Sequence, residues 1–431
     1  MISDIKQIVY LKKVIYLLDN QLGTVEERTL LLQDLLKEIP VSILSAIPIK
    51  DKIENFCLHY NISCNISTID PSTNQNKKAK SDRSIAERLL QNEFPAVLSE
   101  LSPMLLNKQK YYQTLETMCT VMVLSNDFRK IHEIEYKLET NFDDPKTSHK
   151  THNHSSLSRE EIHSLRNTQV LVCLSYFLQG KYLDCVQKMF QFIDKDNKLL
   201  NISLRNPKYD VVQPNDLYSM ISISALLSIP LNQIKHFMQL TDVVLFFQLF
   251  PPAKELFNLL KNTKFRAFFT QWMETLNITC KRHYLLGPKL NEVEKVMRVK
   301  IYVFYLSIST RIQVSYLSST LDIKYETVLH DIEELLGKRK ANFVLEGDII
   351  SYRKRSIIND IATILQSNEI EISKLLDVQS RKNTGLKDSI QNYIIANDKN
   401  NDMTITYEDE SMESSRSNHT FSTTENNSSK P

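Results

Sequence analysis

The sequence predicts a mainly α-helical protein in which paired helices in series lead to one compact unit of two helices and a β-hairpin. Three observations support this prediction. The 431 residues include only 6 glycines and 13 prolines, fewer than barrels, sandwiches or glycine-rich phosphate loops require. Apolar residues recur at helical spacing through most of the chain. Two β-rich runs separated by a turn stand out only at residues 343–352.

The first segment, residues 1–62, predicts a small helical module, because apolar side chains from Ile8 to Leu18 share one helix face. Residues 63–84 are rich in Ser, Asn, Thr and Lys and predict a flexible linker. The linker contains a lysine cluster that is compatible with a nuclear import signal, although a solvated linker is the favoured interpretation. The cluster consists of Lys77, Lys78 and Lys80.

The next segment, residues 85–288, contains a repeated pattern with an insertion at 141–158. In this pattern a leucine is followed, four residues later, by an apolar or aromatic residue and, three residues after that, by another apolar residue. The three residues after the leucine fall where a turn between two helices is expected. The three copies are Leu124, Phe128, Ile131; Leu178, Tyr182, Cys185; and Leu227, Leu231, Ile234. Together they predict a helical-hairpin solenoid that resembles tetratricopeptide repeats.

Residues 289–355 predict one long bridging helix and a winged helix. An apolar stripe runs from Val293 to Ile308, a short helix follows around Leu317, and a second helix around Ile332 could end at Gly337 as its C-cap.

Two strands then follow, at 343–345 and 349–352. They flank the turn Glu346-Gly347-Asp348, whose glycine can take a positive φ. Helix, turn, helix and hairpin in this order are typical of a winged helix.

The C-terminal part shows helical spacing without a core of its own. We therefore expect residues 356–396 to be assembly helices that pack on a partner. Residues 397–431 are rich in Ser, Thr, Asn and Glu, and this composition predicts a disordered, mildly acidic tail.

No catalytic, cofactor or metal site is expected. His152-Asn153-His154 is the kind of H-x-H pair that metal-dependent isopeptidases use, but Ile162 and Leu165 stand where a serine and an aspartate would be needed. The 6 cysteines form no CxxC pair, which predicts buried thiols in a reducing compartment. Phosphate-loop and nucleophile motifs are absent, so an interaction protein is predicted rather than an enzyme.

The N-terminal residues also bear on location. Asp4, Lys6, Lys12 and Lys13 interrupt the apolar residues, so the segment lacks the features of a signal peptide. No run approaches the roughly 18 apolar residues of a membrane span. We therefore expect a cytoplasmic and nuclear protein without membrane association.

A winged helix also suggests nucleic-acid binding, because winged helices often bind DNA. The basic clusters Lys338-Arg339-Lys340 and Arg353-Lys354-Arg355 flank the hairpin and could contact phosphates. The second helix argues against this, since its exposed face is predicted to be acidic and would repel DNA. The acidic residues are Glu326, Asp331, Glu333 and Glu334. A winged-helix nucleic-acid-binding protein is kept as the alternative from another class.

A family resemblance emerges from four segments: Asn215–Tyr218, His283–Leu285, Arg298–Tyr302 and Tyr316–Tyr352. In these segments the chain resembles PCI-domain subunits of the COP-nine signalosome, the proteasome lid and translation initiation factor three. It is most similar to the group that contains the largest PCI subunit of the signalosome and its proteasome-lid counterpart, in a divergent form of the budding-yeast type. Lys324 departs from the family's preference for a small polar N-cap.

The resemblance implies a non-catalytic scaffold subunit that supports cullin deneddylation in a hetero-oligomer with other PCI-domain and signalosome subunits. A proteasome-lid or initiation-factor subunit is the alternative. PCI subunits pair their winged-helix sheets edge to edge and bundle their C-terminal helices, and exposed strand edges attract further strands. The expected partner-binding residues are Phe343, Val344, Leu345, Ile349, Ile350 and Tyr352 in the sheet, and Ile357, Ile361, Ile364, Leu365 and Leu375 in the bundle helix.

Overall fold

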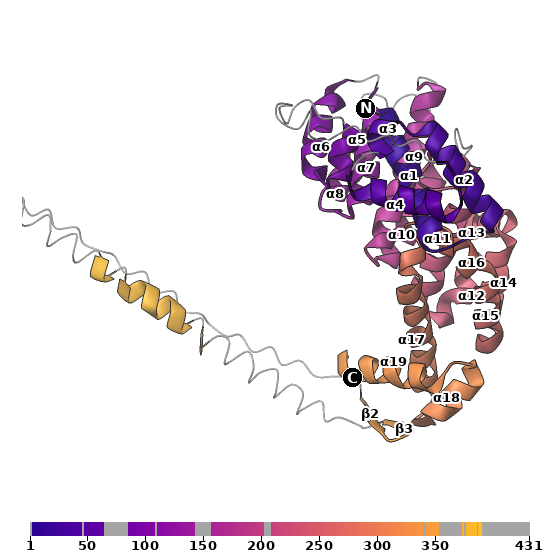
Figure 1. The fold of residues 1–431 in the computed structure, drawn as a ribbon. Helices are drawn as coiled ribbons and strands as arrows, with labels where there is room; N and C mark the ends of the chain where they lie inside the picture. The colour runs from indigo at the N-terminus through magenta and orange to yellow at the C-terminus, as the bar shows by residue number, and fades with distance from the viewer. Residues whose placement is uncertain are drawn as a thin grey trace, which may run out of the picture. The chain divides into compact units, whose positions relative to one another are not determined.

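The computed structural model describes two compact units, Met1–Arg353 and Lys354–Pro431. The prediction of a mainly helical protein with one small sheet is confirmed (Figure 1). The residues that the structure describes are 2–44, 47–63, 85–107, 110–142, 157–201, 208–338, 342–352, 373–374, 376–385 and 387–389.

The first helices form a layer that lies against the following ones. They are α1 (Ile2–Asp19), α2 (Val25–Glu38), α3 (Val41–Leu44), α4 (Ile47–His59), α5 (Ile85–Leu90) and α6 (Phe94–Leu101). A capping box starts α2, in which the Thr24 hydroxyl accepts from the Glu27 N–H and the Glu27 carboxylate accepts from the Thr24 N–H. Lys12 donates to the Leu124 carbonyl at 3.3 Å and Tyr16 to the Lys281 carbonyl at 3.1 Å, so α1 is attached at distant points of the same unit.

A series of antiparallel helix pairs follows: α7 (Tyr111–Ser125), α8 (Ile131–Phe142), α9 (Arg159–Leu178), α10 (Tyr182–Lys195) and α11 (Pro214–Ser228). The three predicted turns are confirmed, because α7, α9 and α11 end within one residue of the leucine of each pattern. Asn126 has a φ of 55° and Gly180 a φ of 74°, which are the left-handed conformations that close two of these helices. Residues 168–178 of α9 are all buried, because α7, α10 and α11 pack against α9.

The helices after α11 are shorter: α12 (Ile234–Phe237), α13 (Thr241–Leu249), α14 (Pro251–Lys261), α15 (Phe265–Trp272) and α16 (Ile278–Lys281). A π-helical turn, Met273–Asn277, joins α15 to α16. Within the described ranges, no single helix has the length and apolar content of a membrane span, whereas α11 and the segment Leu231–Phe237, bent by 114°, meet that test as a pair.

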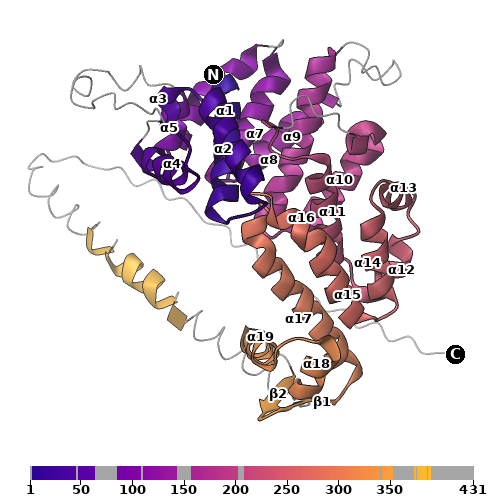
Figure 2. The same cartoon turned by 45° about the vertical axis from the view of Figure 1, so that its right-hand side comes forward.

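The predicted bridging helix is α17 (Leu290–Ile308), which runs from the helix pairs to the sheet-bearing part of the unit (Figure 2). Lys300 on α17 donates to the carbonyls of Leu226 and Ile229, at the end of α11. Burial lowers the pKa of Lys300 to about 8. The ammonium therefore satisfies carbonyls that a helix end leaves without partners, and joins α17 to α11.

The sheet-bearing part contains β1 (Arg311–Gln313), α18 (Val314–Leu321), α19 (Tyr325–Lys338), β2 (Phe343–Glu346) and β3 (Ile349–Tyr352). Its antiparallel strands lie in the order β1-β3-β2, with Ile350 of β3 opposite Ile312 and Leu345. The predicted strands and the positive φ of Gly347, 62°, are confirmed. The C-cap assigned to Gly337 is wrong, because Gly337 lies inside α19, which continues to Lys338.

In the second unit, the described residues 373–374, 376–385 and 387–389 are helical and exposed. Leu376 and Val378 have exposed fractions of 64% and 50%. Apolar side chains of this size on a solvated helix agree with the expectation that these helices pack on a partner, which stays a prediction.

Candidate functional site

The β-sheet is the candidate partner interface, and the structure assigns its strands to different positions. β3 lies in the middle. The Tyr352 N–H donates to the Thr310 carbonyl at 2.8 Å, so alternate residues of β3 bond to β1 and to β2 in turn. In β2, the main-chain groups of Phe343 and Leu345 consequently point away from β3. Among the described residues no further strand covers this edge.

The opposite edge of the sheet is formed by β1, which the sequence analysis missed. The Val314 N–H donates to the Asp348 carbonyl at 2.9 Å, so the main-chain groups of Arg311 and Gln313 point outward. β1 has only three residues and polar ends, so the only signal in the sequence is the single apolar Ile312 before α18. A pattern of this length cannot be distinguished from a loop.

The turn between β2 and β3 is attached to α18 through Asp348. The carboxylate of Asp348 accepts from the Ser315 N–H at 3.0 Å and from the Ser315 hydroxyl at 2.5 Å. Hydrogen bonds from Ser315 lower the pKa of Asp348 below its ordinary value. The hairpin is thereby held against the first turn of α18.

An open hollow lies beside β1. Its apolar walls are uncovered, since Ile308 is 65% and Tyr316 51% exposed. Apolar side chains beside a free strand edge are the arrangement that an added strand uses, with main-chain bonds to the edge and side chains in the hollow. The hollow is lined by Tyr305, Ile308, Ser309, Arg311, Ile312, Gln313, Tyr316 and Ile349.

The predicted sheet residues differ in accessibility. Ile350 is fully buried, so its side chain belongs to the core of the sheet-bearing part. The rings of Phe343 and Tyr352 meet edge to face with centroids 5.4 Å apart, and Tyr352 is 47% exposed. Val344, Leu345 and Ile349 are half-buried. Partner binding by these residues stays a prediction, and Ile357, Ile361, Ile364, Leu365 and Leu375 lie outside the described residues.

The acidic face predicted for α19 is only partly present. Asp331 is 2% exposed and accepts from Arg298 of α17 at 2.7 Å, so placing it on the exposed face was wrong. Glu334 is half-buried and forms an ion pair with Lys295, also on α17. These residues face α17, and Glu326 and Glu333 keep the outer face acidic. Most of the two flanking basic clusters lies outside the described residues: Arg339 and Lys340 of the first cluster, and all of Arg353-Lys354-Arg355.

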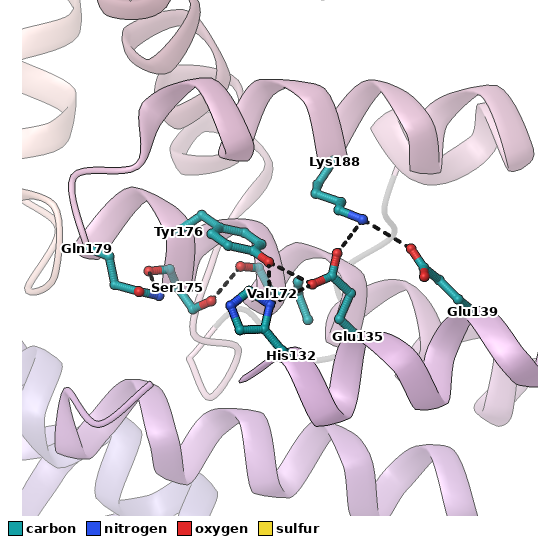
Figure 3. Close-up of polar contacts among 8 residues, drawn as sticks. All are labelled: His132, Glu135, Glu139, Val172, Ser175, Tyr176, Gln179 and Lys188. Carbon is teal, nitrogen blue, oxygen red and sulfur yellow. Dashed lines mark hydrogen bonds and ion pairs between the residues drawn. The ribbon is translucent and has the colours of Figure 1, made fainter. Parts of the chain in front are cut away.

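A polar cluster buried among α8, α9 and α10 is the other conspicuous group (Figure 3). Its centre is Glu135, which is 6% exposed. The Tyr176 hydroxyl donates a hydrogen bond to the Glu135 carboxylate at 2.6 Å, and His132 Nδ1 lies 3.3 Å from the same carboxylate. Lys188 forms an ion pair with Glu135 and donates a hydrogen bond to Glu139 at 3.1 Å. No pattern along the chain indicates this cluster, because its members come from three helices.

The protonation of this cluster favours a structural role. Burial opposes ionisation of Glu135, yet hydrogen bonds from Lys188 and Tyr176 hold its pKa below its ordinary value. Burial and the hydrogen bond to Glu135 raise the pKa of Tyr176. Desolvation lowers the pKa of Lys188, but its contacts with the carboxylates of Glu135 and Glu139 outweigh this effect and raise it. Near neutral pH the carboxylate is therefore ionised and both donors keep their protons, an arrangement that fixes three helices and leaves neither Tyr176 nor Lys188 as a nucleophile.

We expect Glu135→Gln to lower the free energy of unfolding by about 1–3 kcal/mol, because the half-buried Lys188 ammonium and the buried Tyr176 hydroxyl lose a charged acceptor. Glu139→Gln is the matched control and should cost under about 1 kcal/mol, since Glu139 is 40% exposed. The pKa of Glu135 is depressed in the folded state, so its contribution is present above the ordinary value of 4.5 and declines below it. Urea unfolding at several pH values measures both effects, and equal costs for the two variants would contradict the assignment.

The predicted buried thiols are confirmed for Cys57, Cys119, Cys173, Cys185 and Cys280. Burial raises the pKa of Cys185 and of Cys280 to about 12, which keeps them protonated and unreactive. Cys64 and the His152-Asn153-His154 segment lie outside the described residues. In the described part of the chain, no group of three or more His, Cys, Asp or Glu is arranged to hold a metal ion.

Comparison with known proteins adds to this geometry. Two family models match: the CSN11 N-terminal domain over residues 1–292 and the CSN11 C-terminal domain over residues 311–428. The chain is 33% identical to Cop9 signalosome complex subunit 11 of Saccharomyces cerevisiae over 333 residues, 75% of each chain. It is 28% identical to COP9 signalosome complex subunit 11 of Candida glabrata, over 92% of this chain and 91% of the relative. The same subunit of Kluyveromyces lactis is 28% identical, over 74% of this chain and 82% of the relative.

Proposed function

Because the chain belongs to the CSN11 family, we propose that it is a subunit of a COP9 signalosome complex. The observation that carries the proposal is the match of both family models, the first of which ends in the first turn of the bridging helix α17 and the second of which begins just after that helix. The relatives are named as subunits of that complex. The partners of this chain are therefore other signalosome subunits in a hetero-oligomer.

The proposed architecture is a tetratricopeptide-like solenoid followed by a winged helix, as in PCI-domain subunits. The helix pairs α7–α8 and α9–α10, with tight turns at Asn126 and Gly180, support the solenoid. The order β1, α18, α19, β2, β3 in a single three-stranded sheet supports the winged helix. We also propose that this chain is the counterpart of the largest PCI subunit of other signalosomes. Identifying the subunits that neighbour this chain in its complex would test this correspondence.

The proposed docking surface is the sheet with its two open edges. The edge at β2 offers the main-chain groups of Phe343 and Leu345, and the edge at β1 offers those of Arg311 and Gln313. Two different edges allow one chain to contact two different neighbours, so the sheet can occupy an internal position in a row of subunits. The exposed Leu376 and Val378 supply a further contact with a partner helix.

The proposed role is that of a non-catalytic scaffold that supports cullin deneddylation by a metal-dependent subunit of the same complex. The buried polar cluster around Glu135 and the buried thiols are consistent with this role, because their protonation suits structure rather than nucleophilic chemistry. The chain is proposed to act in the cytoplasm and the nucleus. The lysine cluster at Lys77, Lys78 and Lys80, a candidate import signal, lies outside the described residues.

Affinity purification of the tagged full-length chain from its own cells, followed by mass spectrometry, tests the proposal. Signalosome subunits are the expected partners. Recovery of a set of proteasome-lid or initiation-factor subunits in their place would overturn it. Retention on DNA or RNA that weakens steeply with salt would favour the nucleic-acid alternative, which the acidic Glu326 and Glu333 on the outer face of α19 oppose.

A further inference from the structure

The two open edges of the sheet match each other in direction. β1 and β2 both run antiparallel to the central β3, so they run parallel to one another. A second copy of the chain can therefore continue the sheet in the same sense, with its β1 beside the β2 of the first copy. Figure 2 shows β1 and β2 at one end of the unit Met1–Arg353, away from α1, α2 and α7.

The main-chain groups of the two edges are staggered as a parallel pair of strands requires. Leu345 of β2 and Ile312 of β1 stand at the same level in the sheet, on either side of β3. Leu345 directs its main-chain groups outward, whereas in β1 the residues that flank Ile312, Arg311 and Gln313, do so. With Leu345 beside the Ile312 of a second copy, the Leu345 N–H can donate to the Arg311 carbonyl and the Leu345 carbonyl can accept from the Gln313 N–H.

The apolar side chains of the two edges fit together on one face of the sheet. Ile350 is buried on this face, with Ile312 and Leu345 as its neighbours, and the alternation of side chains places Phe343 on the same face. Phe343 and Leu345 are half-buried at the β2 edge. At the β1 edge, Ile312 lines the hollow together with the exposed Ile308. Side chains from the β2 edge of one copy can therefore fill the hollow of the next.

Opposite charges lie at opposite edges of the other face. Arg311 of β1 and Glu346 of β2 alternate with the inward side chains and are exposed. Neither side chain forms a hydrogen bond or an ion pair with another described residue. In the same register Glu346 stands beside the Gln313 of the second copy and diagonal to its Arg311, within reach of long side chains. Pairing two β1 edges or two β2 edges would leave both charges without an opposite charge.

We propose that this chain associates with further copies of itself head to tail, with the β2 edge of one copy paired to the β1 edge of the next. The contact leaves one edge open at each end of a row, so rows grow beyond two copies. Each junction joins strands of three and four residues, which predicts weak association with a Kd on the order of 10–100 µM. The inference rests on the proposed function, because signalosome subunits that bind the same edges would displace the row.

Sedimentation velocity of the purified full-length chain, from about 1 to 200 µM, tests the proposal. The weight-average mass should rise continuously with concentration and pass that of a dimer. A chain that stays monomeric, or a mass that stops at the dimer, would overturn it. If such a chain still recovers signalosome subunits from cells, the proposed function stands and only this inference fails. Rows formed by a chain that recovers no signalosome subunits would have the opposite meaning.

Charge reversal at the two edges assigns the contact. Arg311→Glu gives a chain with two acidic edges and Glu346→Arg a chain with two basic edges, so each should self-associate roughly tenfold more weakly. An equimolar mixture of the two variants should recover association, because each edge then meets an opposite charge. Glu333→Arg, on the exposed face of α19, changes the net charge as Glu346→Arg does and should have no effect. Unchanged association of both edge variants, or a mixture that associates no better than either variant alone, contradicts the proposed pairing.

Discussion

Phe343→Pro is expected to abolish co-purification of the chain with its signalosome partners, while Phe343→Ala retains it. Phe343 opens β2, and its N–H points away from β3 to the open edge. Proline removes this donor without breaking a bond to β3, and it is tolerated at the first residue of an edge strand. Both substitutions remove the ring that contacts Tyr352, so a difference between them reports the edge alone.

The same comparison applies to β1, with Arg311→Pro against Arg311→Ala, because the main-chain groups of Arg311 also point outward. If each edge holds one neighbour, the two proline variants should lose different partners in quantitative mass spectrometry of the purified complexes. Circular dichroism should show an unchanged helical signal in all four variants. Full recovery of every partner with both proline variants would rule out the sheet edges as docking surfaces.

Asp331→Ala is expected to lower the free energy of unfolding by about 3–5 kcal/mol. Asp331 is 2% exposed and accepts from Arg298, whose side chain is 17% exposed, so the substitution leaves a guanidinium buried without its counter-charge. The bond joins α17 to α19, and its loss should loosen the sheet-bearing part from the bridging helix. Hydrogen exchange of α18 and α19 should rise before that of α9.

Two comparisons make the Asp331 result decisive. Glu333→Ala lies two residues away on the exposed face of α19 and should change stability by less than about 0.5 kcal/mol. The double variant Arg298→Met, Asp331→Leu replaces both charges with apolar groups and should recover most of the loss. A cost below about 1 kcal/mol for Asp331→Ala in urea unfolding would contradict a buried ion pair.

Local sequence patterns predicted the structure correctly where residues that are close in the chain decide the conformation. Asn126 and Gly180 lie in turns that were predicted from the repeated leucine pattern, and Gly347 takes the positive φ that its turn requires. Helical spacing from Val293 to Ile308 lies within α17. These features depend on contacts between residues within one or two helical turns of each other, so the spacing of residue types along the sequence predicts them.

Gly337 marks where local reasoning failed. A glycine near the end of an apolar pattern predicts a C-cap, yet α19 continues through Gly337 to Lys338. A Cβ at position 337 would meet nothing within 4 Å outside its own stretch of helix, so a close approach of another segment does not explain the glycine either.

The candidate site was only partly predictable for a related reason. The strands of the hairpin were found, but β1 was not, and β1 decides that β3 is central and that the sheet has a second open edge. Asp331 has the sequence signature of an exposed acidic residue, because the arginine that buries it lies on another helix. Glu135, Tyr176 and Lys188 likewise show nothing unusual along the chain until three helices bring them together.

The sequence by itself determined the helical class, most turns and the hairpin, since these follow from residue type and short-range spacing. Only the tertiary structure decided which charges are buried and which strand edges are open. Those properties depend on pairs such as Arg298 with Asp331 and Tyr176 with Glu135, which are far apart in the chain. Hydrophobic periodicity specifies that a face is buried but not what it is buried against, so such pairs appear only after the helices pack.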